Sequence, residues 1–230
     1  MQTIMPHVQV SIYDPVIFPL SRRCVADAAI IASPAHCHKD DVRWCIEHNM
    51  PFFVEKPLGV FVSLTACDPR SAVGFHYRFH KQWHDIVTLA YEQSSLHFYV
   101  REQLFTRYGA TAKETSTSHS IDIACTILGV ACFDKVSLST DGIRVYGTIT
   151  HSNGISIYDY DINTFPKNVW IGNATRKIVL ERDDSCYQQE MEAWMRCLDG
   201  KERDARLATI ADGVTVEYIL SRVTHGIMAT

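Results

Sequence analysis

A strand–helix–strand order near the N-terminus is the feature that most constrains the fold. Residues 25–33 are apolar almost throughout and end at Pro34, a pattern typical of a strand buried on both faces of a sheet. Residues 38–49 carry apolar side chains at helical spacing, and residues 51–54 form a second short apolar run. This order forms a βαβ unit, in which the two strands are parallel. The sequence therefore predicts an α/β fold with a parallel sheet, and residues 7–13 predict a further strand that closes at Asp14.

A different pattern begins after about residue 75. Asp141-Gly142 and Asn153-Gly154 each separate two alternating segments, and such dipeptides favour tight hairpins because both residues tolerate positive φ. These pairs predict a mostly antiparallel sheet. The β-prone segments are residues 96–105, 135–139, 143–150, 154–162, 167–171 and 174–181.

Two helices are predicted near the end of the chain, over residues 186–198 and 205–225. We therefore expect an α/β domain over residues 1–75 and an α+β domain with an open antiparallel sheet over residues 76–204. The final helix, within residues 205–226, is free to pack back on the first domain.

The composition is that of a globular protein, with 47% hydrophobic and 21% charged residues. Lys and Arg number 22 against 26 Asp and Glu, so there is no basic excess to bind a nucleic acid. The apolar runs are shorter than the roughly 18–20 residues that span a bilayer, and the N-terminus lacks the pattern of a signal peptide. We expect a cytoplasmic protein without a nucleic-acid or membrane partner.

The eight cysteines are scattered, with no CxxC pair among them. This spacing favours reduced, buried thiols over a zinc site or a redox dithiol. His36, Cys37 and His38 are adjacent in sequence and cannot easily converge on one ion, so no metal site is expected.

Several polar residues follow the predicted strands, where open α/β sheets bind ligands. Lys56, in Glu55-Lys56-Pro57, can orient an alcohol or carbonyl oxygen or donate a proton to it, and His119 can serve as a general acid or base. Each also has a structural interpretation, as a solvated strand-end lysine and as a polar residue at a helix start. Ser33, Pro34 and His38 form either a ligand loop or a loop that caps the helix 38–49, and Asp14 either binds a ribose or makes a turn.

Other patterns carry less chemistry. His76, His80 and His84 follow a four-residue spacing where a strand passes into a loop, and we expect them on the surface. The sequence contains no phosphate-binding loop, no Gly-x-Ser-x-Gly nucleophile elbow and no GxGxxG motif.

Taken in order, these segments resemble the Gfo/Idh/MocA oxidoreductases, the relatives of glucose–fructose oxidoreductase and inositol dehydrogenase. The Glu55-Lys56-Pro57 box in this setting is specific, and the resemblance spans nearly the whole chain. The matching segments are residues 26–34, His38, residues 54–58, 73–79, 118–122, Leu128-Gly129, residues 192–194, Asp199-Gly200 and His225-Gly226.

The resemblance implies a reduced Rossmann-like domain that binds NAD or NADP, followed by a sheet domain that usually forms a homo-oligomer interface. Lys56 and His119 would be the catalytic pair for hydride transfer to or from a sugar, polyol or related hydroxylated metabolite, and Pro57 would follow a cis peptide bond. The implied cofactor-binding residues are Asp14, Ser33, Pro34, His38, Glu55, Lys56 and Pro57. Asp14 favours NAD, and Arg22 and Arg23 would favour NADP if they folded beside it.

The sequence also departs from the family pattern. Only six residues precede His7, so we expect the glycine-rich turn that holds the pyrophosphate to be missing. The usual acid four residues before His119 is Thr115. These departures favour the alternative of a catalytically inactive relative that serves as an oligomeric binding or structural protein. Our hypothesis for these departures is selection for a short gene, as in a virus.

Overall fold

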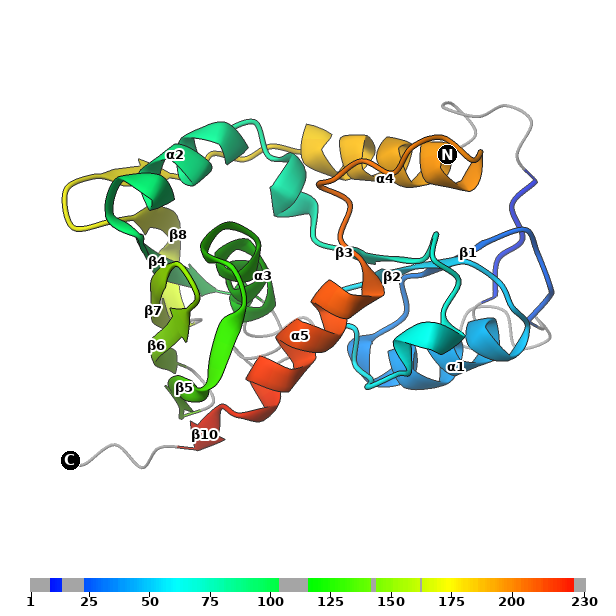
Figure 1. Ribbon diagram of the computed structural model, residues 1–230, viewed down its shortest axis with the longest axis horizontal. Helices are drawn as coiled ribbons and strands as arrows, with labels where there is room; N and C mark the ends of the chain where they lie inside the picture. The colour runs from blue at the N-terminus through cyan, green and yellow to red at the C-terminus, as the bar shows by residue number, and fades with distance from the viewer. Residues whose placement is uncertain (1–8, 14–22, 104–115, 142–143, 162, 226–230) are drawn as a thin grey trace.

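The computed structural model describes residues 9–13, 23–103, 116–141, 144–161 and 163–225. The described strands form one three-stranded sheet and one seven-stranded sheet. Figure 1 shows the two sheets in separate halves of the molecule, with helix α5 (Ile210–Ser221) running between them. The predicted fold class, a Rossmann-like parallel sheet followed by a mostly antiparallel sheet, is confirmed.

The three-stranded sheet contains β1 (Ala29–Ile31), β2 (Phe52–Glu55) and β3 (Ala72–Gly74), in that order and all parallel. A short 3₁₀ turn, η1 (Ala35–Cys37), and helix α1 (His38–Glu47) connect β1 to β2, as the βαβ pattern predicted.

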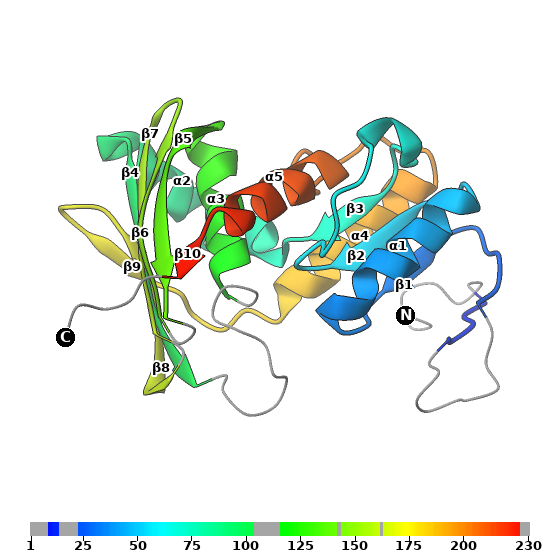
Figure 2. The same ribbon diagram turned by 90° about the horizontal axis from the view of Figure 1, so that it is seen from below.

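Helices cover both faces of this sheet because its central strand is apolar on both sides. Phe52 and Val54 pack in one cluster with Val42 and Cys45 of α1. Phe53 faces the other way, toward helix α4 (Ser185–Leu198). Figure 2 shows α1 and α4 on opposite sides of β2 and β3.

The second sheet has the strand order β10-β5-β6-β7-β4-β8-β9. Its neighbours are antiparallel except for two parallel pairs, β10 with β5 and β4 with β7. The predicted meander of β5, β6 and β7 is confirmed, and β8 and β9 pair as a further antiparallel hairpin. The strands are β4 (Ser95–Gln103), β5 (Ala131–Thr140), β6 (Arg144–His151), β7 (Gly154–Asp161), β8 (Asn163–Gly172), β9 (Lys177–Val179) and β10 (Thr224–His225).

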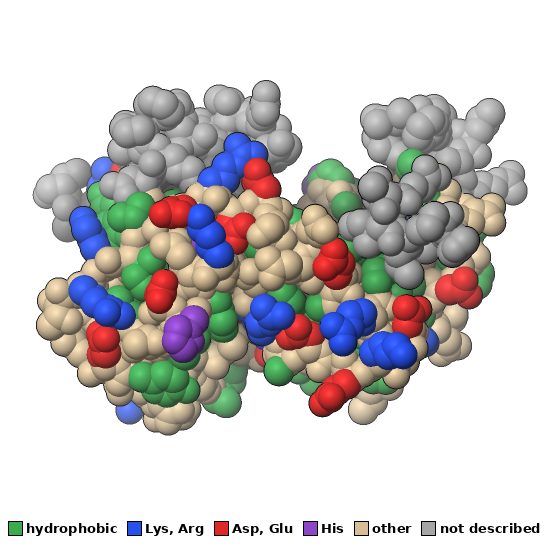
Figure 3. All heavy atoms as spheres, turned by 90° about the horizontal axis from the view of Figure 1, so that it is seen from above, with side chains coloured by type: hydrophobic (Ala, Val, Ile, Leu, Met, Phe, Trp, Pro, Cys, Tyr) green, Lys and Arg blue, Asp and Glu red, His purple; other side chains and the backbone are tan. Residues whose placement is uncertain are grey.

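Helices α2 (Trp83–Gln93) and α3 (Ser116–Leu128) pack against the second sheet, and Figure 2 shows α3 and α5 on the same side of it. Two 3₁₀ turns, η2 (Leu64–Ala66) and η3 (His76–Phe79), flank β3. No helix in the described part of the chain is both long and apolar enough to cross a membrane. On the face shown in Figure 3, Lys and Arg side chains are interspersed with Asp and Glu.

Three predictions about elements were wrong. Residues 9–13 form no strand, and their side chains are exposed, so nothing buries the apolar members of that pattern. The strand at residues 29–31 is not buried on both faces, because no described element covers Ile30, which is 41% exposed. The last helix begins at Ile210 rather than residue 205, because Thr209 and Asp212 form a capping box there.

Helix α5 packs against the first sheet at a position without a side chain. A Cβ at Gly213 would lie 2.7 Å from Val73 Cγ2 and 3.2 Å from Leu58 Cδ2. The glycine therefore allows α5 to approach β3 closely, and the final helix does contact the first sheet. Helix α4, within the predicted range of the second domain, also packs on this sheet. The boundary between the two domains stays a prediction.

We expect Gly213→Leu to lower the free energy of unfolding by about 2–3 kcal/mol, because the added side chain overpacks the α5–β3 contact. Ala211→Leu on the same helix, at an exposed position, should change it by less than about 0.5 kcal/mol. Urea unfolding followed by circular dichroism measures both. Equal losses in the two variants would contradict this close approach.

Candidate functional site

The carboxyl ends of β2 and β3 lie next to each other and form the base of the site. Glu55 is in register with Gly74, and Lys56 and Phe75 are the residues that follow. A Cβ at Gly74 would lie 3.4 Å from Glu55 Oε2, so the Glu55 carboxylate lies over the glycine. The Lys56–Pro57 peptide bond is cis, as the resemblance implied. Ligands of open α/β sheets bind at this edge.

Helix α3 brings His119 to the turn that follows β3. Its ring centroid lies 4.4 Å from that of His76, 4.8 Å from that of Tyr77 and 5.9 Å from that of Phe75. His119 is 5% exposed. The backbone of Lys56, which follows Glu55, and the ring of His119 therefore both lie near the turn formed by Phe75 and His76, although the two residues are far apart in the sequence.

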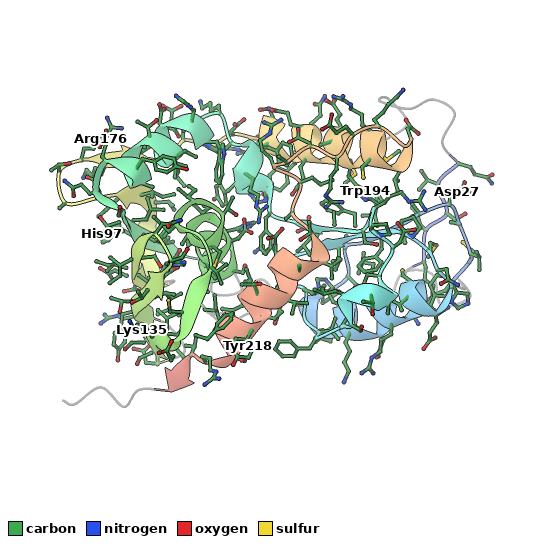
Figure 4. The ribbon with its side chains drawn as sticks, viewed as in Figure 1. Asp27, His97, Lys135, Arg176, Trp194 and Tyr218 are labelled. Carbon is green, nitrogen blue, oxygen red and sulfur yellow. The ribbon has the colours of Figure 1, made fainter. Side chains whose placement is uncertain are left out.

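Helix α4 covers the same turn from the other side. The ring of Tyr187 stacks on that of His76 at a centroid distance of 4.0 Å. Trp194 points from α4 toward the first sheet, as Figure 4 shows, and its Nε1 donates a hydrogen bond to the Arg70 carbonyl at 3.0 Å. This buried tryptophan anchors the helix that carries Tyr187.

Two carboxyl groups of the site have raised pKa values. Burial raises the pKa of Glu55, and the neighbouring Lys56 opposes this. Burial raises the pKa of Glu190, on α4, to about 9, and the nearby carboxylates of Glu55 and Asp122 add to the effect. Glu190 is therefore a neutral acid at pH 7.

An ion pair fixes α3 against the turn after β3. Arg78 donates two hydrogen bonds to Asp122, at 2.9 Å and 2.5 Å, and both side chains are at most 5% exposed. Asp212 of α5 lies 3.5 Å from the same guanidinium. Burial raises the pKa of Asp122 to about 6 although Arg78 lowers it, so the pair is ionised at neutral pH. Asp122 lies on α3 three residues after His119. Its ion pair with Arg78 thereby helps to hold that histidine in place.

Predicted cofactor residues after β1 are linked to β2 by hydrogen bonds within the protein. His38 is buried, with Nδ1 2.7 Å from the Pro57 carbonyl and Nε2 2.8 Å from the Ser33 carbonyl. The Ser33 hydroxyl donates to Asp41, which also accepts from Arg23. The structure thus brings Ser33, His38 and Pro57 together. Exposed Pro34 precedes η1, whereas Asp14 and Thr115 lie outside the described residues.

The prediction of three surface histidines was wrong for two of them. His76 is 7% exposed because Tyr187 covers its ring, and His80 is 3% exposed, with Nε2 2.9 Å from the Glu181 carbonyl. His84 is exposed, as predicted. The sequence analysis also missed Tyr187 and Glu190, whose spacing of three along a predicted helix was the only signal that they share a face.

The predicted free thiols are confirmed, since all eight cysteines are unpaired, but only three of them are fully buried. Within the described ranges, no group of three His, Cys, Asp or Glu side chains could hold a metal ion.

Comparison with solved structures finds dehydrogenases of similar fold. The WlbA (WbpB) dehydrogenase from Thermus thermophilus, in complex with NAD and UDP-GlcNAcA, is similar with a TM-score of 0.68 and 14% identity over 87% of this chain and 74% of that chain. A putative myo-inositol dehydrogenase from Sinorhizobium meliloti 1021 is similar with a TM-score of 0.64 and 15% identity over 86% and 77% of the two chains. The chain has the fold of these dehydrogenases.

A third similar structure is UDP-N-acetylglucosamine 3-dehydrogenase GnnA from Acidithiobacillus ferrooxidans, with a TM-score of 0.63 and 13% identity over 85% of this chain and 76% of that chain. No family model and no curated protein matches the sequence. The fold that the resemblance to the Gfo/Idh/MocA oxidoreductases implied is therefore confirmed.

We expect Asp122→Asn to lower the free energy of unfolding by about 3 kcal/mol or more, because it leaves the buried Arg78 guanidinium without its main partner. Asp204→Asn breaks the part-exposed ion pair with Arg206 and should cost less than about 1 kcal/mol. Denaturant unfolding compares the two. In the double variant Arg78→Met with Asp122→Leu, most of the loss should be recovered, and a further loss there would contradict the account of the pair.

Proposed function

We propose that the chain is an NAD- or NADP-dependent oxidoreductase that transfers a hydride to or from a sugar, polyol or related hydroxylated metabolite. The observation that supports the proposal is that the backbone of Lys56 and the ring of His119 both lie near the Phe75–His76 turn, at the carboxyl edge of the parallel sheet. An ammonium group can donate a hydrogen bond to the oxygen of an alcohol, and an imidazole can accept the proton of that oxygen.

The similar structures support the choice of ligands. The Thermus thermophilus dehydrogenase is described in complex with NAD and UDP-GlcNAcA, and another of its structures with NAD and α-ketoglutarate. NAD is therefore the cofactor to test first, with NADP as its alternative. Arg23, which could have favoured NADP, instead donates to Asp41.

The described residues fit the reactive half of such a cofactor better than its pyrophosphate. A nicotinamide bound at this edge would supply the hydride carrier. Lys56, Glu55 and His119 provide charge and proton-transfer groups there. In the loop after β1, however, the Ser33 hydroxyl is used by Asp41, and no described glycine-rich turn offers backbone N–H groups. No described residue is assigned to the pyrophosphate.

The two side chains have complementary roles in this reaction. Oxidation of a secondary alcohol breaks a C–H bond, whose two electrons leave as hydride, and an O–H bond, whose proton must be taken up. Lys56 donates a hydrogen bond to the substrate oxygen and orients it, and His119 accepts the proton. In the reverse direction His119 returns the proton to the oxygen as the carbonyl is reduced.

Binding is tested by titrating the purified protein with NADH and NADPH and following nicotinamide fluorescence. We expect saturable binding that Lys56→Ala weakens about tenfold, because the positive charge that attracts the anionic cofactor is lost. Lys39→Ala, at an exposed position on α1, is the matched control and should leave binding unchanged. Absence of binding to the folded protein would overturn the proposal for the isolated chain.

Activity is tested with a panel of polyols, free sugars and nucleotide sugars, including myo-inositol and UDP-N-acetylglucosamine. With a substrate found, His119→Asn should lower kcat by roughly 100-fold or more and change KM little, because proton transfer is lost while binding persists. A variant with full kcat would exclude His119 as the proton acceptor.

A second candidate is an inactive, oligomeric relative, which the protein-internal hydrogen bonds of Ser33 and His38 favour. The face of the second sheet opposite α3 carries aromatic and aliphatic side chains, among them the stacked Tyr99 and Trp170 and the part-exposed Tyr146 and Ile155. We propose that this face forms a homo-oligomer in either case. Light scattering of the purified protein, with Tyr146→Arg as the disrupting variant, tests the assembly.

A further inference from the structure

Glu190 is a buried acid that the proposed reaction does not use. It lies on α4, one helical turn after Tyr187, and is 3% exposed. Its Oε1 atom is buried and has no hydrogen-bond partner among the described residues. A backbone hydrogen bond from Phe75, the first residue of the turn after β3, reaches its carboxyl group. Glu190 is thus in contact with the turn near which Lys56 and His119 lie.

The cations near Glu190 already have other carboxyl groups beside them. Arg78 is engaged by Asp122 and by Asp212. Burial raises the pKa of Glu55, and the positive charge of Lys56, which follows it directly, opposes this rise. A third carboxylate in this buried region would face two negative charges, and burying an ion without a counter-ion is costly.

We propose that Glu190 is a charge-setting residue of the candidate site: held as a neutral acid, it adds no negative charge near Glu55 and Lys56, and the site binds an anionic dinucleotide more tightly while Glu190 keeps its proton. The inference rests on the proposed function, because it concerns binding at the same site. It makes Glu190 a positioning residue, which acts through the charge that Lys56 presents.

The pKa of about 9 places the change in charge above neutral pH. Ionisation of Glu190 would add a negative charge near Glu55, weaken the attraction that Lys56 offers to an anion, and repel the ligand. Other titratable or charged groups on the surrounding elements also face this region, so a comparison between variants is needed. These groups are Glu55 and Lys56 after β2, His76 and Arg78 on η3, His119 and Asp122 on α3, Cys186 and Tyr187 on α4 and Asp212 on α5.

The test is the pH dependence of NADH binding to the wild-type protein and to Glu190→Gln, which is uncharged and nearly isosteric. We expect the two proteins to have similar dissociation constants at pH 7. At pH 9.5 the dissociation constant of the wild type should be larger than that of Glu190→Gln by roughly threefold to tenfold. The other groups titrate in both proteins and cancel in the ratio. Glu192→Gln removes a less buried carboxylate from the same helix and should show no such pH-dependent ratio.

Thermal unfolding from about pH 4.5 to above pH 9 tests the protonation of Glu190 directly, without any ligand. Because the folded pKa of Glu190 is raised from 4.5 to about 9, the wild-type protein is most stable relative to Glu190→Gln near pH 4.5 and loses that stability as the pH rises to 9. The midpoint of Glu190→Gln minus that of the wild type should therefore increase with pH and level off above 9.

The outcomes separate this inference from the proposed function. A midpoint difference that stays flat with pH shows an ordinary ionised glutamate and overturns the inference. A rising midpoint difference with a pH-independent binding ratio shows a neutral acid without influence on the ligand, and also overturns it, while the function stands. Absence of NADH binding to both folded proteins at pH 7 overturns the proposed function and the inference together, and the fluorescence signal identifies that case.

Discussion

The ion pair of Arg78 and Asp122 joins the parts of the molecule that build the site. Arg78 belongs to the turn after the parallel sheet, and Asp122 belongs to α3, which packs on the second sheet. Asp212 attaches α5 to the same guanidinium. Because a buried guanidinium needs its partner, the relative position of these three elements is specified by one interaction. The distance between His119 and the strand ends follows from it.

In the same region, carboxyl groups differ in protonation because their surroundings differ. Four carboxyl groups lie near the turn after β3, and two cations are available to them among the described residues. Arg78 is shared by Asp122 and Asp212, and Lys56 stabilises Glu55. Glu190 receives no cation of its own, and burial raises its pKa to about 9, whereas the pKa of Asp122 is raised to about 6. Glu190 and Asp122 thus differ in protonation at neutral pH because of their neighbours.

The elements that the sequence predicted are those with strong local patterns. The βαβ unit and the meander followed from apolar periodicity and from Asp-Gly and Asn-Gly pairs, which act within a few residues. The candidate pair of Lys56 and His119 came from a family resemblance, and local pattern alone would have left each with a structural interpretation. Helix α2, the burial of His76 and the role of α4 were missed because they depend on packing between distant segments. Tyr187 covers His76 only after α4 has returned to the first sheet.

The Glu-Lys-Pro box alone does not discriminate between an enzyme and an inactive relative. Pro57 is tied through its carbonyl to buried His38, which also reaches the Ser33 carbonyl, so this part of the box connects the loops of the first sheet. An inactive protein would need that connection as much as an active one. Glu190 is different, because a buried acid whose Oε1 lacks a described partner lowers the stability of the fold at neutral pH. The proposed ligand site would explain a residue with that cost, and the protonation of Glu190 is therefore the more informative property to measure.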